Sequence, residues 1–499
     1  MKKKNFILIP ITSILLLLGT GCSVVGPDYK KPKEQQLPDT WDTNLTKSDE
    51  SIQEWWKSFN DETLNTLVEK TYEQNLDLRG AGLRILQART ALGISQGLTY
   101  PQLQSVSGSL AGVRAGGNNF ASAGVSFDVG WEMDVWGKYA RGIESSEATL
   151  YASIASYDDI LVSIIAEVAR NYINYTTAQE RIAFAKRNIK IQEQVTKMTE
   201  IQFNAGNVSE LDMQQSRTQL YTTMSILPAL ELTQVKSQNA IAILLGILPQ
   251  DVEQILKVAE TNSTEFIPNI TLSDDFKINA DIVKRRPDLQ VAELQARAQS
   301  ARIGSAEAEL YPHFSLFGSV GLNTNNAGSS WVSAGDAIGI SVGPSFSWNI
   351  FQYDRIKNQV RIQDAKFQES LANYNKKVLQ AVGEVSNALN GYRLTKKQLE
   401  LNKQAIEATT RAYSLSVTQY ENGLVTYQRL LSTVESLTRN EDAYAQIKGN
   451  IALQVISLYK ALGGSFNLEQ HEYINTKDLD SMKERGVDWG DYLENENDK

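Results

Sequence analysis

Alternation of apolar and polar positions marks four segments of the chain as strands. Between Ala121 and Val135 nearly every odd position is apolar, and the even positions are mostly small or polar. Residues 338–350 and 313–323 alternate in the same way, and residues 102–114 do so more weakly. A period of two predicts strands with one apolar and one polar face. Strands of roughly ten to fifteen residues with two such faces suit a transmembrane barrel.

Aromatic residues near the strand ends favour a membrane barrel over a soluble sandwich with one wet side, because such rings favour the membrane interface. These residues are Tyr100, Trp131, Trp136, Tyr311, Trp331 and Trp348.

Two longer segments carry a helical pattern. Residues 142–203 and 355–420 contain no proline, and their apolar residues recur at spacings of three and four. This spacing predicts coiled-coil-like helices of roughly 90–100 Å at about 1.5 Å per residue. Each helix is followed by a glycine, Gly206 or Gly423, which can adopt the left-handed conformation that ends a helix. We expect both turns at the same end, far from the strands.

The chain is an internal duplication. Leu76-Asp77-Leu78 recurs as Pro287-Asp288-Leu289, and later matches keep the same order in both halves. We therefore expect repeat 1 at residues 61–260 and repeat 2 at residues 275–465, each a helix, two strands and a long helical hairpin.

Four strands per chain cannot close a barrel, and lipid does not tolerate open sheet edges. Two chains would give about eight strands, whose interior is filled by side chains. Three chains would give about twelve and leave a lumen, so a homotrimer is favoured.

The first residues are typical of an export signal. Lys2, Lys3 and Lys4 precede an apolar run, and small residues lead to Cys22, the only cysteine. This resembles a lipoprotein signal at residues 1–21 with lipidation at Cys22; the alternative is a secretory signal with an incidental cysteine. Ser23 fits outer-membrane sorting. Prolines then predict an extended, lipidated N-terminal strap over residues 22–60.

Charge and composition limit the classes of partner that the protein can bind. The 499 residues carry a net charge of −9, and 46 basic against 58 acidic residues remain beyond the signal. This balance disfavours nucleic acid as a partner, because phosphate binding needs clustered Lys and Arg. It suggests a mild preference for cations in a channel. The acidic C-terminal tail, residues 466–499, is interpreted as polar periphery or disorder.

The sequence offers no convincing catalytic site. Ser95 and Ser341 both lie in G-x-S-x-G matches, but Ser95 falls in a helical segment and Ser341 within a strand. A nucleophile elbow needs a strand, a sharp turn and a helix. His313 lies on the polar face of a strand, where a wall residue is expected rather than a ligand. We therefore expect no enzyme, no metal and no cofactor beyond the lipid on Cys22.

Taken together, the lipidation signal, the tandem repeat, the two strands per repeat and the Tyr-x-x-Gly turn at Tyr420–Gly423 resemble the outer membrane factor (TolC-like) family, specifically its lipoprotein efflux branch. The resemblance spans about residues 22–465. It implies an α+β membrane protein whose trimer forms a 12-stranded β-barrel continued by an α-helical periplasmic tunnel.

The resemblance also implies a function. The chain would be the outer-membrane exit channel of a tripartite efflux system, anchored by lipid and extending into the periplasm. It would dock on a periplasmic adaptor protein and an inner-membrane pump, and would passively conduct drugs, toxic compounds or ions. Two alternatives are a channel for polypeptide secretion and a structural lipoprotein that spans the periplasm.

The same resemblance nominates site residues. The hairpin tips at Gly206, Asn207, Gly423 and Leu424 would contact the adaptor.

The periplasmic gate candidates are Tyr420, Gln428, Arg429, Ser432 and Glu435. In that family an Asp and an Arg after the second turn commonly help to close the entrance, but Ser432 and Glu435 stand at those places here. Gln428 stands where the family often has an apolar constriction residue. Arg429 and Glu435 are a candidate substitute ion pair between subunits; otherwise they lie on a solvated helix face.

Overall fold

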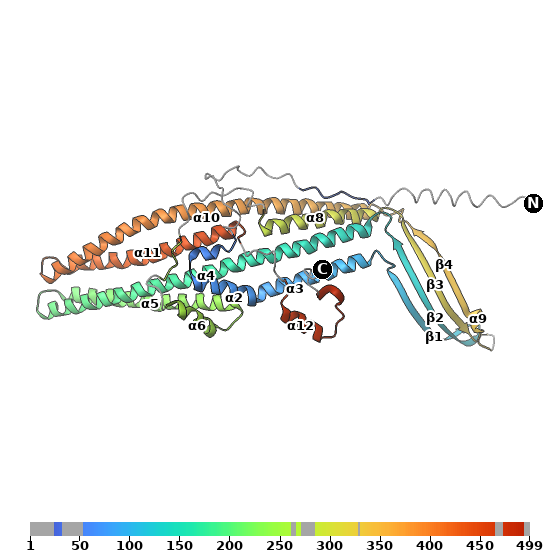
Figure 1. Ribbon diagram of the computed structural model, residues 1–499, viewed down its shortest axis with the longest axis horizontal. Helices are drawn as coiled ribbons and strands as arrows, with labels where there is room; N and C mark the ends of the chain where they lie inside the picture. Colours follow the sequence, from blue (N-terminus) through green and yellow to red (C-terminus); the bar gives the residue numbers. More distant parts are fainter. Residues whose placement is uncertain are drawn as a thin grey trace, which may run out of the picture.

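The computed structural model describes residues 24–31, 53–260, 266–270, 285–327, 330–464 and 473–493. The molecule is elongated, with a β-sheet at one end and two helical hairpin turns at the other (Figure 1). In these ranges no helix is both long and apolar enough to cross a membrane.

The sheet has four antiparallel strands in the order β1-β2-β3-β4. The strands are β1 Leu103–Ala115, β2 Asn118–Met133, β3 His313–Asn325 and β4 Ile338–Ser347, with the short helix α9 Ala334–Ala337 before β4. Each predicted strand is confirmed. The fourth ends at Ser347, so the extension of this strand to residue 350 is wrong. Strands β1 and β4 lie at the two edges of the sheet.

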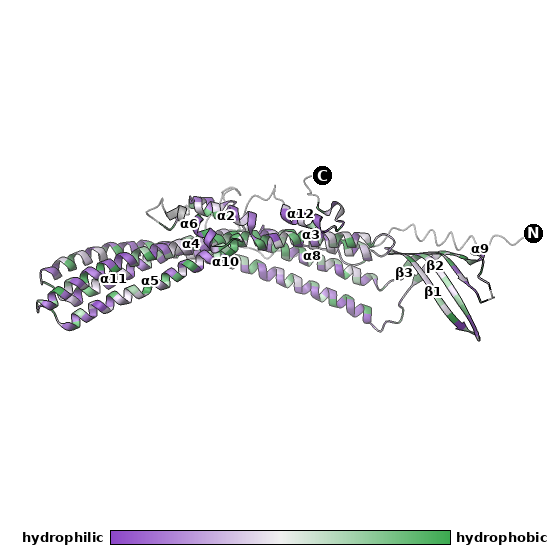
Figure 2. Ribbon diagram, turned by 90° about the horizontal axis from the view of Figure 1, so that it is seen from below, coloured by the Kyte–Doolittle hydropathy of each residue, from purple (hydrophilic) through white to green (hydrophobic). Residues whose placement is uncertain are grey.

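The helices confirm the tandem repeat. Helices α3 and α8 have 22 residues each, and α4 and α10 have 67 each. Their bounds are α3 Leu76–Gly97, α4 Lys138–Asn204, α5 Glu210–Leu245, α8 Pro287–Ala308, α10 Arg355–Glu421 and α11 Tyr427–Ala461. A helix of 67 residues is about 100 Å long. Figure 2 shows hydrophilic and hydrophobic residues interspersed along these helices rather than segregated into long apolar runs.

Local sequence explains where these helices begin. The Asn75 side chain accepts a hydrogen bond from the Leu78 N–H and caps α3. Ser209 and Asp212 form a reciprocal capping box at the start of α5. Before α4, Gly137 adopts a left-handed conformation with φ 77°, and Asp354 does the same before α10 with φ 59°. The two repeats therefore turn from strand to helix by the same backbone geometry.

The hydrophobic core lies midway along the helices. It is built from α2 Glu62–Gln74, α3, α4, α5, α6 Pro249–Glu260, α8, α10 and α11. The first predicted helix of repeat 1 is in fact α2 and α3, separated at Asn75. The additional helices α2 and α6 lie against the first hairpin, α4 and α5 (Figure 1).

The prediction of a surface strap through residue 60 is wrong for the 3-10 helix η2, Trp55–Phe59. Trp55 is 2% exposed and Trp56 is fully buried. The Trp55 ring stacks on Tyr459 at 5.3 Å, and its indole N–H donates to the Gly464 carbonyl. Each indole ring has a large apolar surface. The free energy gained by burying both rings therefore outweighs the preference for extended backbone that the preceding prolines impose.

Residues 24–31 carry no helix or strand and run across α4 and α8. The Val25 N–H donates to the Trp136 carbonyl at 3.0 Å, and Arg141 donates to the carbonyls of Val25 and Gly26. Gly26 crosses directly over Gly304: a side chain on Gly26 would collide with the Gly304 backbone, and one on Gly304 would collide with the Val25 carbonyl and the Arg141 side chain.

Of the two readings of the tail, disorder is wrong for residues 473–493. These residues include helix α12, Thr476–Glu484, and the 3-10 helix η3, Gly490–Leu493. Arg79 of α3 donates two hydrogen bonds to Asp478, and Tyr473 packs edge-on against Tyr157. The acidic composition gave no sign that this segment packs on the helices. A buried carboxylate, Asp478, and an aromatic ring, Tyr473, attach it there.

We expect Trp55→Ala to destabilise the protein by about 3–5 kcal/mol, because it leaves a cavity under Tyr459. Denaturant unfolding followed by circular dichroism on the purified protein measures this difference. The matched change Trp331→Ala removes an indole that is 50% exposed, and should change stability by about 0.5 kcal/mol or less. Equal losses in the two variants would contradict a core role for Trp55.

Candidate functional site

One face of the sheet is apolar and exposed. The register places Val106 opposite Phe127, Phe127 opposite Val320, and Val320 opposite Ile340. These four side chains form one row across all four strands, and each is between 43% and 76% exposed. A contiguous exposed apolar surface of this kind marks a membrane or protein contact.

The opposite face is polar. In the neighbouring row, Ser105, Asp128, Ser319 and Ser341 lie side by side on the four strands. The Ser126 hydroxyl donates to the Asp128 carboxylate at 2.8 Å, and lies 2.9 Å from the Ser107 hydroxyl. Ser341 thus lies within a strand, as expected. This face suits contact with water, whereas the other suits contact with lipid.

A polar cluster joins the sheet to the long helices. His313 begins β3, and its two ring nitrogens lie 2.7 Å from Glu132 of β2 and 3.3 Å from Glu309. Lys138, the first residue of α4, forms an ion pair with Glu309 at 2.7 Å. The Tyr139 hydroxyl donates to Glu132 at 2.9 Å. Both nitrogens of His313 are therefore engaged in holding strand ends against helix ends, which fits a structural role better than a ligand-binding one.

The two predicted hairpin tips lie at the same end of the molecule (Figure 1). Gly206 and Gly423 have φ of 76° and 69°, the left-handed conformation expected of them. The backbone N–H of Asn207 donates to Gln202, and that of Leu424 donates to Gln419. These bonds satisfy carbonyls at the helix ends. The Leu424 side chain is 75% exposed, so an apolar side chain projects from the second tip.

The first gate candidate, Tyr420, is buried within its own chain. Its hydroxyl lies 3.4 Å from the Thr199 hydroxyl, and its ring packs edge-on against Tyr427 at 6.2 Å. Burial raises the pKa of Tyr420, and raises that of Tyr427 to about 12. Both phenols are therefore neutral at physiological pH. They fasten the second hairpin, α10 and α11, to the first, α4 and α5.

The other gate candidates lie along α11. Gln428, Arg429 and Ser432 are exposed, and Glu435 is half-buried. Arg429 and Glu435 are six residues apart, about 240° around the helix, so they cannot pair within one chain.

Glu435 instead lines a cavity of about 440 Å³ between α4, α5 and α11, together with Arg181, Arg439 and Asp442. Arg181 pairs with Asp442 there at 2.7 Å. The sequence alone does not reveal this charged cavity, because residues that meet in it, such as Arg181 and Asp442, are 261 positions apart in the chain.

Comparison with known proteins decides the family. The family described as "Outer membrane efflux protein" matches residues 67–247 and 280–464, one match for each repeat. The chain belongs to the outer membrane efflux protein family. Its fold is that of an outer-membrane channel subunit, as predicted, and the family description names efflux rather than a chemical reaction.

Individual relatives agree with this assignment. Nodulation protein T of Rhizobium leguminosarum bv. trifolii is 28% identical over 90% of this chain and 97% of its own length. The probable outer membrane lipoprotein SilC of Salmonella typhimurium is 24% identical over 92% of this chain and 98% of its own. The structure of the outer-membrane channel OprN matches with a TM-score of 0.78 and 29% identity, over 88% of this chain and 99% of that one.

The lipidation candidate Cys22 lies outside the described residues, as do the signal residues 1–21. The described strap begins two residues later, at Val24.

In an outer membrane efflux protein the two faces of β4 should respond oppositely to charge. Ile340→Arg places a guanidinium on the apolar face and should cost about 2–4 kcal/mol near the membrane midplane. Ser341→Arg, on the next residue, places the same group on the polar face and should be tolerated. Yield of folded protein in outer-membrane fractions measures both. Equal yields would show that the apolar face does not contact lipid.

Proposed function

We propose that three copies of this chain close one 12-stranded barrel and form the outer-membrane exit channel of a tripartite efflux system. The observation that carries this proposal is the open four-stranded sheet. In the part of the chain that the structure describes, strands β1 and β4 each have one edge without a strand partner, and lipid offers no partner for unpaired backbone groups. Pairing β4 of one copy with β1 of the next removes every edge.

The polar faces favour three copies over two. About eight strands leave an interior just large enough for side chains, whereas about twelve leave a water-filled lumen. The row of Ser105, Asp128, Ser319 and Ser341 would line such a lumen, and the row of Val106, Phe127, Val320 and Ile340 would face lipid.

The long helices extend this lumen into the periplasm. Helices α4 and α10 extend the channel wall about 100 Å away from the sheet. Both hairpin tips lie at the far end of these helices. We place the adaptor contact at Gly206, Asn207, Gly423 and Leu424, where exposed backbone and one exposed leucine are presented. Solutes cross passively, and the inner-membrane pump supplies the energy.

The strap supports a lipid anchor at Cys22. Val25 is bonded to Trp136, beside the end of the sheet. Cys22 precedes Val25 by three residues, which span at most about 10 Å. An acyl group on its thiol can thus reach the membrane that holds the barrel, and three anchors per trimer bind far more firmly than one. Intact mass of the purified chain tests this, since an unlipidated mature mass would exclude the anchor.

Conductance tests the proposed function. The purified protein should show discrete single-channel steps in planar bilayers, and its mass in detergent should be that of three chains. A monomer that never conducts would leave the structural lipoprotein as the better reading. Conduction of an unfolded polypeptide in place of small ions and drugs would favour the secretion channel.

A second test concerns the gate. If Arg429 and Glu435 pair between subunits, Arg429→Gln combined with Glu435→Gln should increase leakage of a large antibiotic into cells severalfold. The control is Glu407→Gln with Arg411→Gln, which removes one exposed charge of each sign from α10. Growth inhibition by the antibiotic measures the leak. An unchanged leak in the first variant would place both residues on a solvated helix face.

A further inference from the structure

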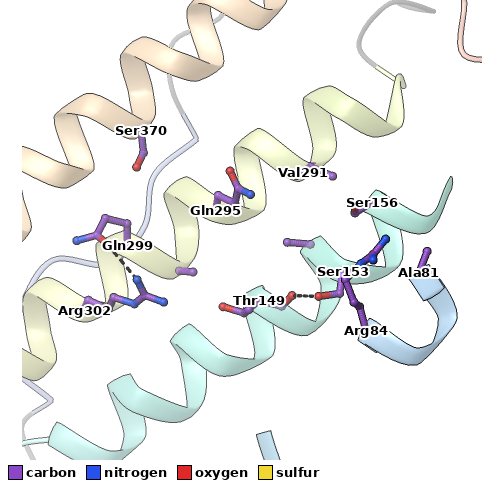
Figure 3. A pocket seen from close by; sticks show the side chains of 12 residues that line it. Ala81, Arg84, Thr149, Ser153, Ser156, Val291, Gln295, Gln299, Arg302 and Ser370 are labelled. Atoms are coloured by element: carbon purple, nitrogen blue, oxygen red, sulfur yellow. Dashed lines mark hydrogen bonds between the residues drawn. The ribbon is translucent and has the colours of Figure 1, made fainter. Parts of the chain in front are cut away.

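Helices α3, α4, α8 and α10 form a layer whose two surfaces differ. The strap covers one surface, where Lys31 pairs with Glu293 and Gly26 crosses Gly304. Helix α12 and its flanking residues cover one side of α3, where the Tyr473 backbone crosses Gly82 and Asp478 pairs with Arg79. The other surface contains a pocket of about 430 Å³ that reaches from α3 to α10 (Figure 3).

Helix periodicity shows that the pocket lies opposite the strap. Gln295 and Arg302 line the pocket, and each is two residues from a strap contact, Glu293 or Gly304. Two residues correspond to about 200° around a helix, so they lie on opposite sides of α8. On α3, pocket residue Arg84 is likewise two residues from Gly82.

The pocket therefore faces the lumen. The strap leads to the lipid anchor, which must lie outside the barrel, so the surface opposite the strap faces inward. This assignment rests on the proposed function. Arg302 is six residues from the end of α8, which places the pocket roughly 10–25 Å below the sheet on the tunnel wall.

The pocket is polar and basic. Its side chains come from four helices: Ala81, Arg84, Thr149, Ala152, Ser153, Ser156, Val291, Gln295, Ala298, Gln299, Arg302 and Ser370. No carboxylate is among them. Arg302 reaches across to α4, where its Nε donates to the Ser145 hydroxyl at 3.2 Å, and its Nη1 lies 3.5 Å from Gln299 Oε1. Figure 3 shows Arg84 entering from α3 beside Ser153.

These two arginines differ from others nearby. Arg79 pairs with Asp478, Arg141 with Asp28 and Glu144, and Arg286 with Asp288 and Glu384. Across the described part of the chain, neither Arg84 nor Arg302 has an acidic partner. Guanidinium groups bind carboxylates and phosphates through paired N–H donors. The surrounding amides and hydroxyls add further donors.

We propose that this pocket is an anion-binding site on the tunnel wall, which binds the carboxylate or phosphate groups of solutes passing through the channel. Each of three copies would contribute one such site at the same height. The tunnel wall at this level would then favour anions, in contrast with the cation preference suggested by the net charge of the chain.

The experiment measures block of single-channel current by citrate and by inorganic pyrophosphate, added to the periplasmic side of the reconstituted full-length protein. Both anions should reduce the current. Arg84→Gln combined with Arg302→Gln should raise the half-blocking concentration at least about tenfold, because two charge-assisted interactions are lost. Block by pyrophosphate alone would assign the site to phosphates, and block by citrate alone to carboxylates.

The control is Arg361→Gln, which removes the same charge from the opposite side of α10. Arg361 and pocket residue Ser370 are nine residues apart, or about 180° around the helix. This variant should leave the half-blocking concentration unchanged. A change of less than about twofold in the double variant, or an equal change in the control, would overturn the site.

A binding measurement separates this inference from the proposed function. Calorimetric titration of the detergent-solubilised trimer with pyrophosphate and with citrate needs no conduction. At least one anion should bind, and binding should weaken in the double variant and persist in the Arg361→Gln protein. Conduction without anion binding or block would overturn the site alone. A protein that never conducts would overturn the channel, and the site's place in its lumen with it.

Discussion

The rest of the structure depends on one constraint: backbone N–H and C=O groups within a membrane must find partners in the protein. The four strands pair with one another through an unbroken antiparallel register, but within the described residues the outer edges of β1 and β4 have no strand partner. In lipid such edges are not tolerated, so the folded chain is one part of a wall that only identical neighbours complete. The division into an apolar and a polar face follows from the same register, because alternate side chains point to opposite sides of a sheet.

A wall of this kind must also join the helices that extend it. Two sets of contacts make the joint. One is the cluster in which Glu132 of β2 and Glu309 at the end of α8 lie against the His313 ring of β3 and the Lys138 ammonium of α4. The other is the strap, whose backbone is bonded to Trp136 and Arg141 on the outside of the layer. Midway down, the buried pair Trp55 and Trp56 packs into the large apolar core that the helices form.

The electrostatics of the wall are local. The chain as a whole is acidic, yet the tunnel surface below the sheet contains Arg84 and Arg302 without a nearby carboxylate. Net charge describes solubility and long-range attraction, whereas a solute in a narrow passage meets the few side chains that line it. On the surface covered by the strap and the C-terminal residues, Arg79 and Arg141 instead form ion pairs with Asp478, Asp28 and Glu144, so the two surfaces differ in chemistry.

Much of this architecture could be predicted from the sequence alone. Periodicity located the four strands and the two long helices, and the repeat showed that they occur as two similar units. Those features are local or repetitive, so a single chain reveals them. The sequence could not show that Trp55 lies against Tyr459, that Asp478 lies against Arg79, or that Arg181 meets Asp442. Each of these contacts joins residues more than 250 positions apart. They depend on how the helices pack, as does the pocket between α3, α4, α8 and α10, and packing is decided only in the tertiary structure.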